Sequence, residues 1–264
     1  MKFSLLTHLI AHSWDLPKLI ETAQGLGFAG LEFRVEEAGG HGVELERTQA
    51  ERRQIRERVE DAYLEIVALG TGARLDSPDE ARRREAMDHV KRYVDLATDL
   101  GCTRIRVFGN DIPEGVCRQD CTAYVGEGLR SIAEYSDPGG VDILLEMHGQ
   151  FNYWGFALEA VMAADHPRVG ILYNCDLKDM VGGSVSATYG RVAKWVRHIH
   201  MHDLASGYPY LELFQLLQRS GYDGYLSPEL STKSPTPDQY LALYATLSKA
   251  WAACASHTSP SSYV

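Results

Sequence analysis

Short apolar runs alternate with longer amphipathic segments along the whole chain. This alternation is typical of parallel sheets, because each strand must be followed by a crossover, usually a helix, before the next parallel strand. The predicted strands are 2–8, 29–34, 63–69, 104–109, 141–147, 169–174, 196–202 and 223–229. Eight such units within 264 residues favour one closed (β/α)8 barrel, an α/β fold with a single domain.

An open, doubly wound sheet is the competing architecture. It normally has a glycine-rich phosphate turn after the first strand, but residues 8–14 contain neither GxGxxG nor a P-loop. The closed barrel is therefore preferred. We expect it to span residues 1–254, with a flexible C-terminal tail over 255–264.

Capping residues predict several helix boundaries. Asp15 precedes a leucine and a proline, and the segments 77–80 and 236–239 have Ser or Thr three positions before an acid or amide. Gly27 and Gly101 follow apolar segments, where a glycine can take the left-handed conformation that ends a helix.

The acidic balance of charges excludes some classes of partner. With 26 Lys and Arg against 36 Asp and Glu, the net charge is -10, which gives no electrostatic footprint for nucleic acid or an anionic membrane. We see no apolar stretch of about 18 residues and no signal peptide.

The five cysteines show no CxxC spacing. We expect a cytoplasmic protein with reduced cysteines.

Polar residues with metal-binding or acid–base capacity end four of the predicted strands, and a parallel barrel gathers these ends around one mouth. The residues are Glu146 and His148, Asn174 and Asp176, His200 and His202, and Glu229. A solvated loop carboxylate is the alternative for each acid. Because four strand ends share the pattern, we predict one site.

Three histidines alternate with apolar residues in the seventh predicted strand, so they point to the same side. We expect His200, near the strand end, to be a metal ligand and His198 to be a hydrogen-bonded core histidine. Two glutamates, a histidine and an Asn or Asp oxygen form a mixed oxygen and nitrogen set. Such a set suits a divalent ion, here Mn²⁺, Mg²⁺, Co²⁺ or Zn²⁺.

These motifs resemble the xylose isomerase-like TIM barrel family, which includes sugar isomerases, ketose 3-epimerases, inosose and dehydroshikimate dehydratases, and endonuclease IV. The motifs are Glu-x-His from Glu146, Gly-Ile-Leu-Tyr-Asn-x-Asp up to Asp176, His-Ile-His-x-x-Asp from His198, and Gly-Tyr-x-Gly-Tyr-Leu-Ser-x-Glu up to Glu229. The early segments 30–34 and 67–70 agree with the resemblance.

The resemblance implies that Glu146 and Glu229 are metal ligands that also transfer protons, with His200 as a third ligand. The sixth strand departs from the family pattern of Asp followed by His three residues later, because Asn174 and Leu177 occupy those positions. Asp176 or His148 could supply the missing ligand, or the metal could be absent.

Further side chains are predicted at the rim of the barrel. The predicted substrate-binding residues are His8, Arg34, Arg106, His148, Trp154 and His202. Glu32 is also expected at this rim. Aromatic faces stack on sugar rings, and Arg or His suits a carboxylate or phosphate.

The resemblance implies a metal-dependent sugar isomerase or epimerase acting on a small polyhydroxylated substrate. A dehydratase of the inosose or dehydroshikimate type uses the same carboxylates and metal, and one sequence does not separate the two. A metal-free, non-catalytic barrel that binds a small molecule is the third reading. Endonuclease IV is disfavoured by the acidic charge. Homo-oligomers are compatible with such a barrel, but no interface is identified.

Overall fold

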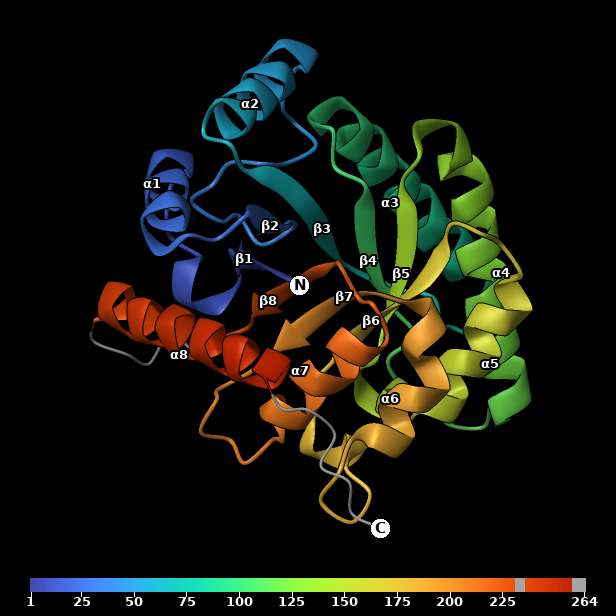
Figure 1. Ribbon diagram of the computed structural model, residues 1–264. Coiled ribbons are helices and arrows are strands. Elements are labelled where there is room, and N and C mark those ends of the chain that lie inside the picture. Colours follow the sequence, from blue (N-terminus) through green and yellow to red (C-terminus); the bar gives the residue numbers. More distant parts are fainter. Residues whose placement is uncertain (231–235, 258–264) are drawn as a thin grey trace.

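Eight parallel strands close into a barrel in the computed structural model, which describes residues 1–230 and 236–257 (Figure 1). Each strand pairs with the next in sequence, and the eighth pairs with the first. The strands are β1 (Lys2–Leu6), β2 (Gly30–Arg34), β3 (Glu65–Arg74), β4 (Arg104–Phe108), β5 (Asp142–Glu146), β6 (Val169–Asn174), β7 (Val196–Met201) and β8 (Tyr225–Pro228). All eight predicted strands are confirmed, as is the TIM barrel fold.

Helices surround the barrel on its outer side, one after each strand (Figure 1). They are α1 (Leu16–Leu26), α2 (Gln49–Asp61), α3 (Glu80–Leu100), α4 (Arg118–Ser136), α5 (Trp154–Ala164), α6 (Ser186–Val192), α7 (Tyr210–Arg219) and α8 (Pro237–His257). The first three residues of the predicted tail, 255–257, belong to α8, and the remainder of that tail lies outside the described residues.

The helix ends follow the predicted chemistry, with one correction. Asp15 caps α1, and Gly27 and Gly101 end α1 and α3 with φ angles of 63° and 69°. The cap of α3 is Asp79 rather than Ser77. Asp79 immediately precedes the helix, so its carboxylate reaches the free N–H groups of the first turn, whereas the Ser77 hydroxyl accepts from Asp79.

The main apolar core lies between the strands and the helices, whereas part of the barrel interior is polar. On β7, Ile199 and Met201 are fully buried in that core. His198 and His200 occupy the alternate positions, and their imidazoles contact Glu32 of β2 inside the barrel. The alternation in the sequence therefore places the apolar packing residues of β7 on the side that faces the helices and its two histidines on the side that faces the barrel interior.

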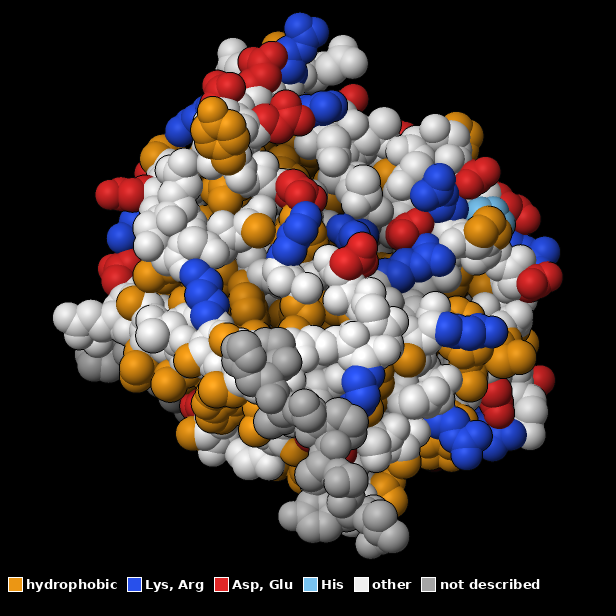
Figure 2. All heavy atoms as spheres, in the orientation of Figure 1, with side chains coloured by type: hydrophobic (Ala, Val, Ile, Leu, Met, Phe, Trp, Pro, Cys, Tyr) orange, Lys and Arg blue, Asp and Glu red, His pale blue; other side chains and the backbone are white. Residues whose placement is uncertain are grey.

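Charged side chains of both signs are mixed on the face shown in Figure 2. Within the described residues, no helix is long and apolar enough to span a membrane. The five cysteines are free thiols.

Candidate metal and proton-transfer site

Glu146, His200 and Glu229 meet at the carboxyl end of the barrel. His200 Nδ1 lies 3.5 Å from Glu146 Oε1 and 4.0 Å from Glu229 Oε2. Glu229 directly follows β8, and its N–H donates to the carbonyl of Met201 at 2.7 Å, which fixes its position beside β7. Glu146 and His200 are buried, whereas the Glu229 side chain is 22% exposed. The structure thus brings together one predicted residue from each of three strand ends.

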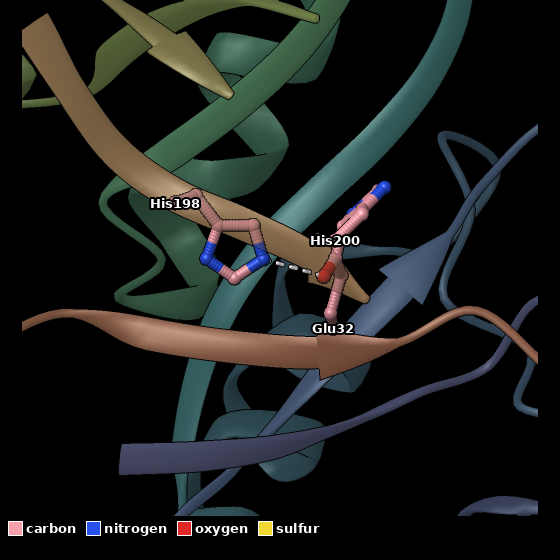
Figure 3. A group of neighbouring side chains, drawn as sticks. All are labelled: Glu32, His198 and His200. Atoms are coloured by element: carbon pink, nitrogen blue, oxygen red, sulfur yellow. Dashed lines mark hydrogen bonds and ion pairs between the residues drawn. The ribbon is translucent and has the colours of Figure 1, made fainter. Parts of the chain in front are cut away.

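Glu32 of β2 contacts both His198 and His200 of β7 (Figure 3). Its carboxylate bonds His198 Nε2 at 2.7 Å and His200 Nε2 at 2.9 Å, and it is fully buried. Burial opposes ionisation of Glu32, but the two histidines outweigh it and hold the pKa of Glu32 well below its ordinary value. Burial also opposes the charge on His200, but Glu32 and Glu146 raise the pKa of His200 to about 10.

Arg106 of β4 controls the charge of Glu146. Its Nη1 lies 3.1 Å from Glu146 Oε2, and its guanidinium group stacks 4.1 Å above the centre of the Phe108 ring. Both members of the pair are buried. Burial alone raises the pKa of Glu146, but Arg106 and His200 outweigh it and lower the pKa to about 2. Glu146 is therefore ionised at neutral pH.

Glu229 has a more exposed set of neighbours. Its Oε1 lies 3.6 Å from His8 Nε2, and its Oε2 lies 3.8 Å from His202 Nδ1. The other nitrogen of His8 lies 3.0 Å from Glu37, which pairs at 3.1 Å with Arg34. His8, His202 and Arg34, three of the predicted substrate-binding residues, thus belong to one network of polar contacts beside Glu229.

The two predicted ligands of the sixth strand have different positions. Asn174 is buried at the end of β6, and its Oδ1 accepts a hydrogen bond from His202 Nε2 at 2.7 Å. Asp176 caps a short 3₁₀ helix, Leu177–Asp179, and accepts from the N–H of Lys178 at 2.8 Å. Because β6 ends at Asn174, the strand alternation that would align Asp176 with it stops there.

His148 and Trp154 lie after β5, in the loop and at the start of α5. His148 is exposed, and its Nδ1 lies 2.6 Å from Asn110 Oδ1. Trp154 is partly buried, and the guanidinium group of Arg191 lies 5.2 Å from the centre of its ring. Both are therefore on the rim rather than within the cluster of Glu146, His200 and Glu229.

Among the described His, Cys, Asp and Glu residues, two groups have ligand atoms within 4.8 Å of one another: Glu32 with His198 and His200, and Glu146 with His200 and Glu229. In the first group, each histidine Nε2 is bonded to a Glu32 oxygen. In the second, His200 Nδ1 is buried without a hydrogen-bond partner among the described residues. Ligand atoms about 2.0–2.2 Å from a divalent ion lie roughly 3–4 Å apart. The second group therefore fits a metal ion.

Glu32 is the functional residue that the sequence interpretation misplaced. We expected it at the rim, but it lies inside the barrel and is fully buried. The sequence did indicate that such a residue exists, because two histidines on the same side of a buried strand need hydrogen-bond partners. The partner's identity depends on which strand faces them across the barrel, and the sequence pattern does not specify that.

Comparison with known proteins agrees with the observed fold. A family model described as "Xylose isomerase-like TIM barrel" matches residues 20–250. No curated protein sequence matches the chain.

Among solved structures, a D-psicose 3-epimerase has a TM-score of 0.81 and 17% identity, covering 96% of this chain and 99% of its own. The 3-keto-D-glucoside 4-epimerase of E. coli has a TM-score of 0.78 and 15% identity, covering 95% and 99%. A probable 3-DHS dehydratase of Bacillus anthracis has a TM-score of 0.73 and 19% identity, covering 94% and 98%. At these identities, the likeness shows a shared fold.

Proposed function

Because the chain belongs to the xylose isomerase-like TIM barrel family, we propose that it is a metal-dependent isomerase or epimerase of small sugars. The similar structures include epimerases of D-psicose and of a 3-keto-D-glucoside, which supports a sugar as the substrate class. Fold similarity alone does not determine a reaction, so the proposal depends on the site.

The observation that carries the proposal is the arrangement of Glu146 and Glu229 around His200 Nδ1, at 3.5 and 4.0 Å. The buried nitrogen has no hydrogen-bond partner among the described side chains, and two carboxylates lie beside it. A divalent ion bound there would act as a Lewis acid that polarises a substrate carbonyl or hydroxyl group. Asn174 and His202 lie next to this group and could add a neutral ligand.

The two glutamates have different environments and so suit different roles. Glu229 is partly exposed and has histidines as neighbours, so it can exchange a proton with the substrate carbon next to the carbonyl. That step breaks the C–H bond and moves its electrons into the carbonyl, giving an enediolate. Glu146 lies on a different strand. In an epimerase it takes up a proton from water and delivers that proton to the opposite face of the carbon, while Glu229 keeps the proton that it removed.

The remaining predicted residues surround this centre and are proposed to bind the substrate. His8 and His202 are beside Glu229. Arg34 pairs with Glu37, which in turn contacts His8. His148 and Trp154 extend the rim after β5. These side chains offer hydrogen-bond donors for hydroxyl groups and an aromatic face for the sugar ring.

A dehydratase is the second candidate, and the contact between Arg106 and Glu146 favours it. Proton return by Glu146 requires its protonated form, whereas Arg106 favours the ionised form. Elimination needs only one acid–base group: Glu229 takes the proton from carbon, the electrons form a C=C bond, and Glu229 returns the same proton to the β-hydroxyl group, which leaves as water. The similar 3-DHS dehydratase has the same fold.

Deuterium exchange tests the reaction class before the substrate is known. The metal-loaded protein is incubated in D₂O with a panel of ketoses, aldoses, inososes and hydroxylated cyclic ketones. Deuterium at the carbon next to the carbonyl supports an isomerase or epimerase, and the ultraviolet absorbance of an enone supports a dehydratase. Both signals should be lost in Glu229→Gln. Neither signal with any substrate in the metal-loaded protein would favour a barrel that only binds a small molecule.

A further inference from the structure

Glu32 is a fully buried carboxylate between two histidines of one strand (Figure 3). We propose that Glu32 is a positioning residue that fixes the tautomer of His200 and so directs its Nδ1 lone pair toward Glu146 and Glu229. This inference rests on the proposed function, because a free Nδ1 lone pair at the mouth serves metal binding.

The direction of the hydrogen bonds follows from the chemistry of the carboxylate. An ionised carboxylate only accepts, so each imidazole that bonds Glu32 must carry its proton on Nε2. The two bonds, at 2.7 and 2.9 Å, use one oxygen each. A bound metal ion displaces the proton from one ring nitrogen and leaves the imidazole neutral; because Glu32 retains the proton on Nε2, the lone pair is then on Nδ1. For His200 that lone pair faces the two glutamates at the mouth.

His198 holds the second carboxylate oxygen of Glu32 in place. Its Nε2 lies 2.7 Å from Glu32 Oε2 and 3.1 Å from the hydroxyl oxygen of Ser227, which is itself 2.7 Å from the hydroxyl of Ser4. All of these side chains are buried. The second oxygen of Glu32 is thereby fixed, and the carboxylate cannot rotate away from His200 without breaking a buried hydrogen bond.

A role for Glu32 as a metal ligand is less consistent with the geometry. Both of its oxygens are already at hydrogen-bond distance from a histidine nitrogen. The atom without a hydrogen-bond partner in the shared histidine is Nδ1, on the other side of the ring. Ligand histidines commonly donate their second N–H to a carboxylate, and loss of that partner lowers metal affinity about 10–100-fold.

Two variants test this role. Glu32→Leu removes both acceptors, and we expect it to bind Mn²⁺ about 10–100-fold more weakly than the wild type. Glu32→Gln keeps the shape but presents one NH₂ group, so one of the two imidazoles must accept at Nε2 and carry its proton on Nδ1. Nitrogen-15 NMR of the histidine side chains in the metal-free protein detects that unprotonated Nε2 without any activity, because both Nε2 atoms are protonated in the wild type.

Two controls separate positioning from other effects. Glu37→Gln removes a carboxylate that pairs with His8 and Arg34 but contacts neither His198 nor His200, so it reports the loss of a nearby negative charge without a change at the two imidazoles. Ser4→Ala removes a hydrogen bond of the same buried layer without removing a contact to either imidazole. We expect both to bind Mn²⁺ more tightly than Glu32→Leu and to keep the wild-type tautomers.

The outcomes are distinct. An unprotonated Nε2 on His200 in the wild type, unchanged tautomers in Glu32→Gln, or wild-type Mn²⁺ affinity in Glu32→Leu would each overturn the positioning role. If Glu32→Leu does not fold, the tautomers of Glu32→Gln decide. A wild type that binds no metal would contradict the proposed function, while the NMR comparison would still test the role of Glu32.

Discussion

Nη1 of Arg106 lies 3.1 Å from Oε2 of Glu146, and both side chains are buried inside the barrel. The pair places a permanent positive charge against a proposed metal ligand. It therefore acts in two opposite ways, because it keeps the carboxylate ionised and also repels a cation that approaches the same carboxylate.

Replacing Arg106 by Gln should change the pH dependence of metal binding. Without the guanidinium group, burial raises the pKa of Glu146 from about 2, so protons compete with metal at higher pH than in the wild type. Mn²⁺ titrations between pH 5 and pH 8 should show weaker binding at the acidic end and equal or tighter binding at the alkaline end. Arg106→Lys, which keeps a positive charge, is the control. A uniform loss of affinity at all pH values would contradict this reading.

The identity of the sixth-strand ligand can be tested with two reciprocal substitutions. Asn174→Asp replaces a neutral amide oxygen by a carboxylate that can still accept from His202, so Mn²⁺ affinity should rise by about tenfold or more. Asp176→Asn should leave the affinity unchanged, because Asp176 caps the following 3₁₀ helix. The opposite result, a loss in Asp176→Asn and no gain in Asn174→Asp, would make Asp176 the ligand.

Asp179 should make folding stability depend on pH. Burial raises its pKa to about 7 from an ordinary value of 3.8. The folded state therefore retains a proton that the unfolded chain releases, and the free energy of unfolding falls as pH rises from about 4 to about 7 and is then level. The full shift corresponds to at most roughly 4 kcal/mol.

Asp179→Asn, whose side chain is uncharged at both pH 4 and pH 7, is the matched variant for this effect. Its free energy of unfolding should improve relative to the wild type between pH 4 and pH 7, as measured by urea denaturation. Its amide oxygen can still accept the 2.9 Å hydrogen bond from Asn152. A constant difference between the two proteins over this range would show that Asp179 does not titrate there.

The fold was predictable because the barrel repeats one unit eight times, and each unit has an apolar run followed by an amphipathic segment. The alternation on β7 also gave His198 and His200 the correct common side. Prediction was less successful where the strands end. The side-chain direction of Asp176 follows from the turn after β6, and strand periodicity does not extend into that turn.

Contacts across the barrel were beyond sequence reasoning for a different reason. The pairing of Glu32 with His200, and of Arg106 with Glu146, depends on the relative height and direction of side chains from different strands. That height is set by the stagger of the closed barrel. A single sequence contains the residues of each pair but not the stagger that brings them together.

The most direct test of the central claim is the metal content of the purified protein after dialysis, measured by elemental analysis in the wild type, Glu146→Gln and His200→Ala. We predict a stoichiometric divalent ion in the wild type and its loss in both variants, with each variant still folded by circular dichroism. A wild type that contains no metal even after reloading, or variants that retain the wild-type amount, would contradict the account.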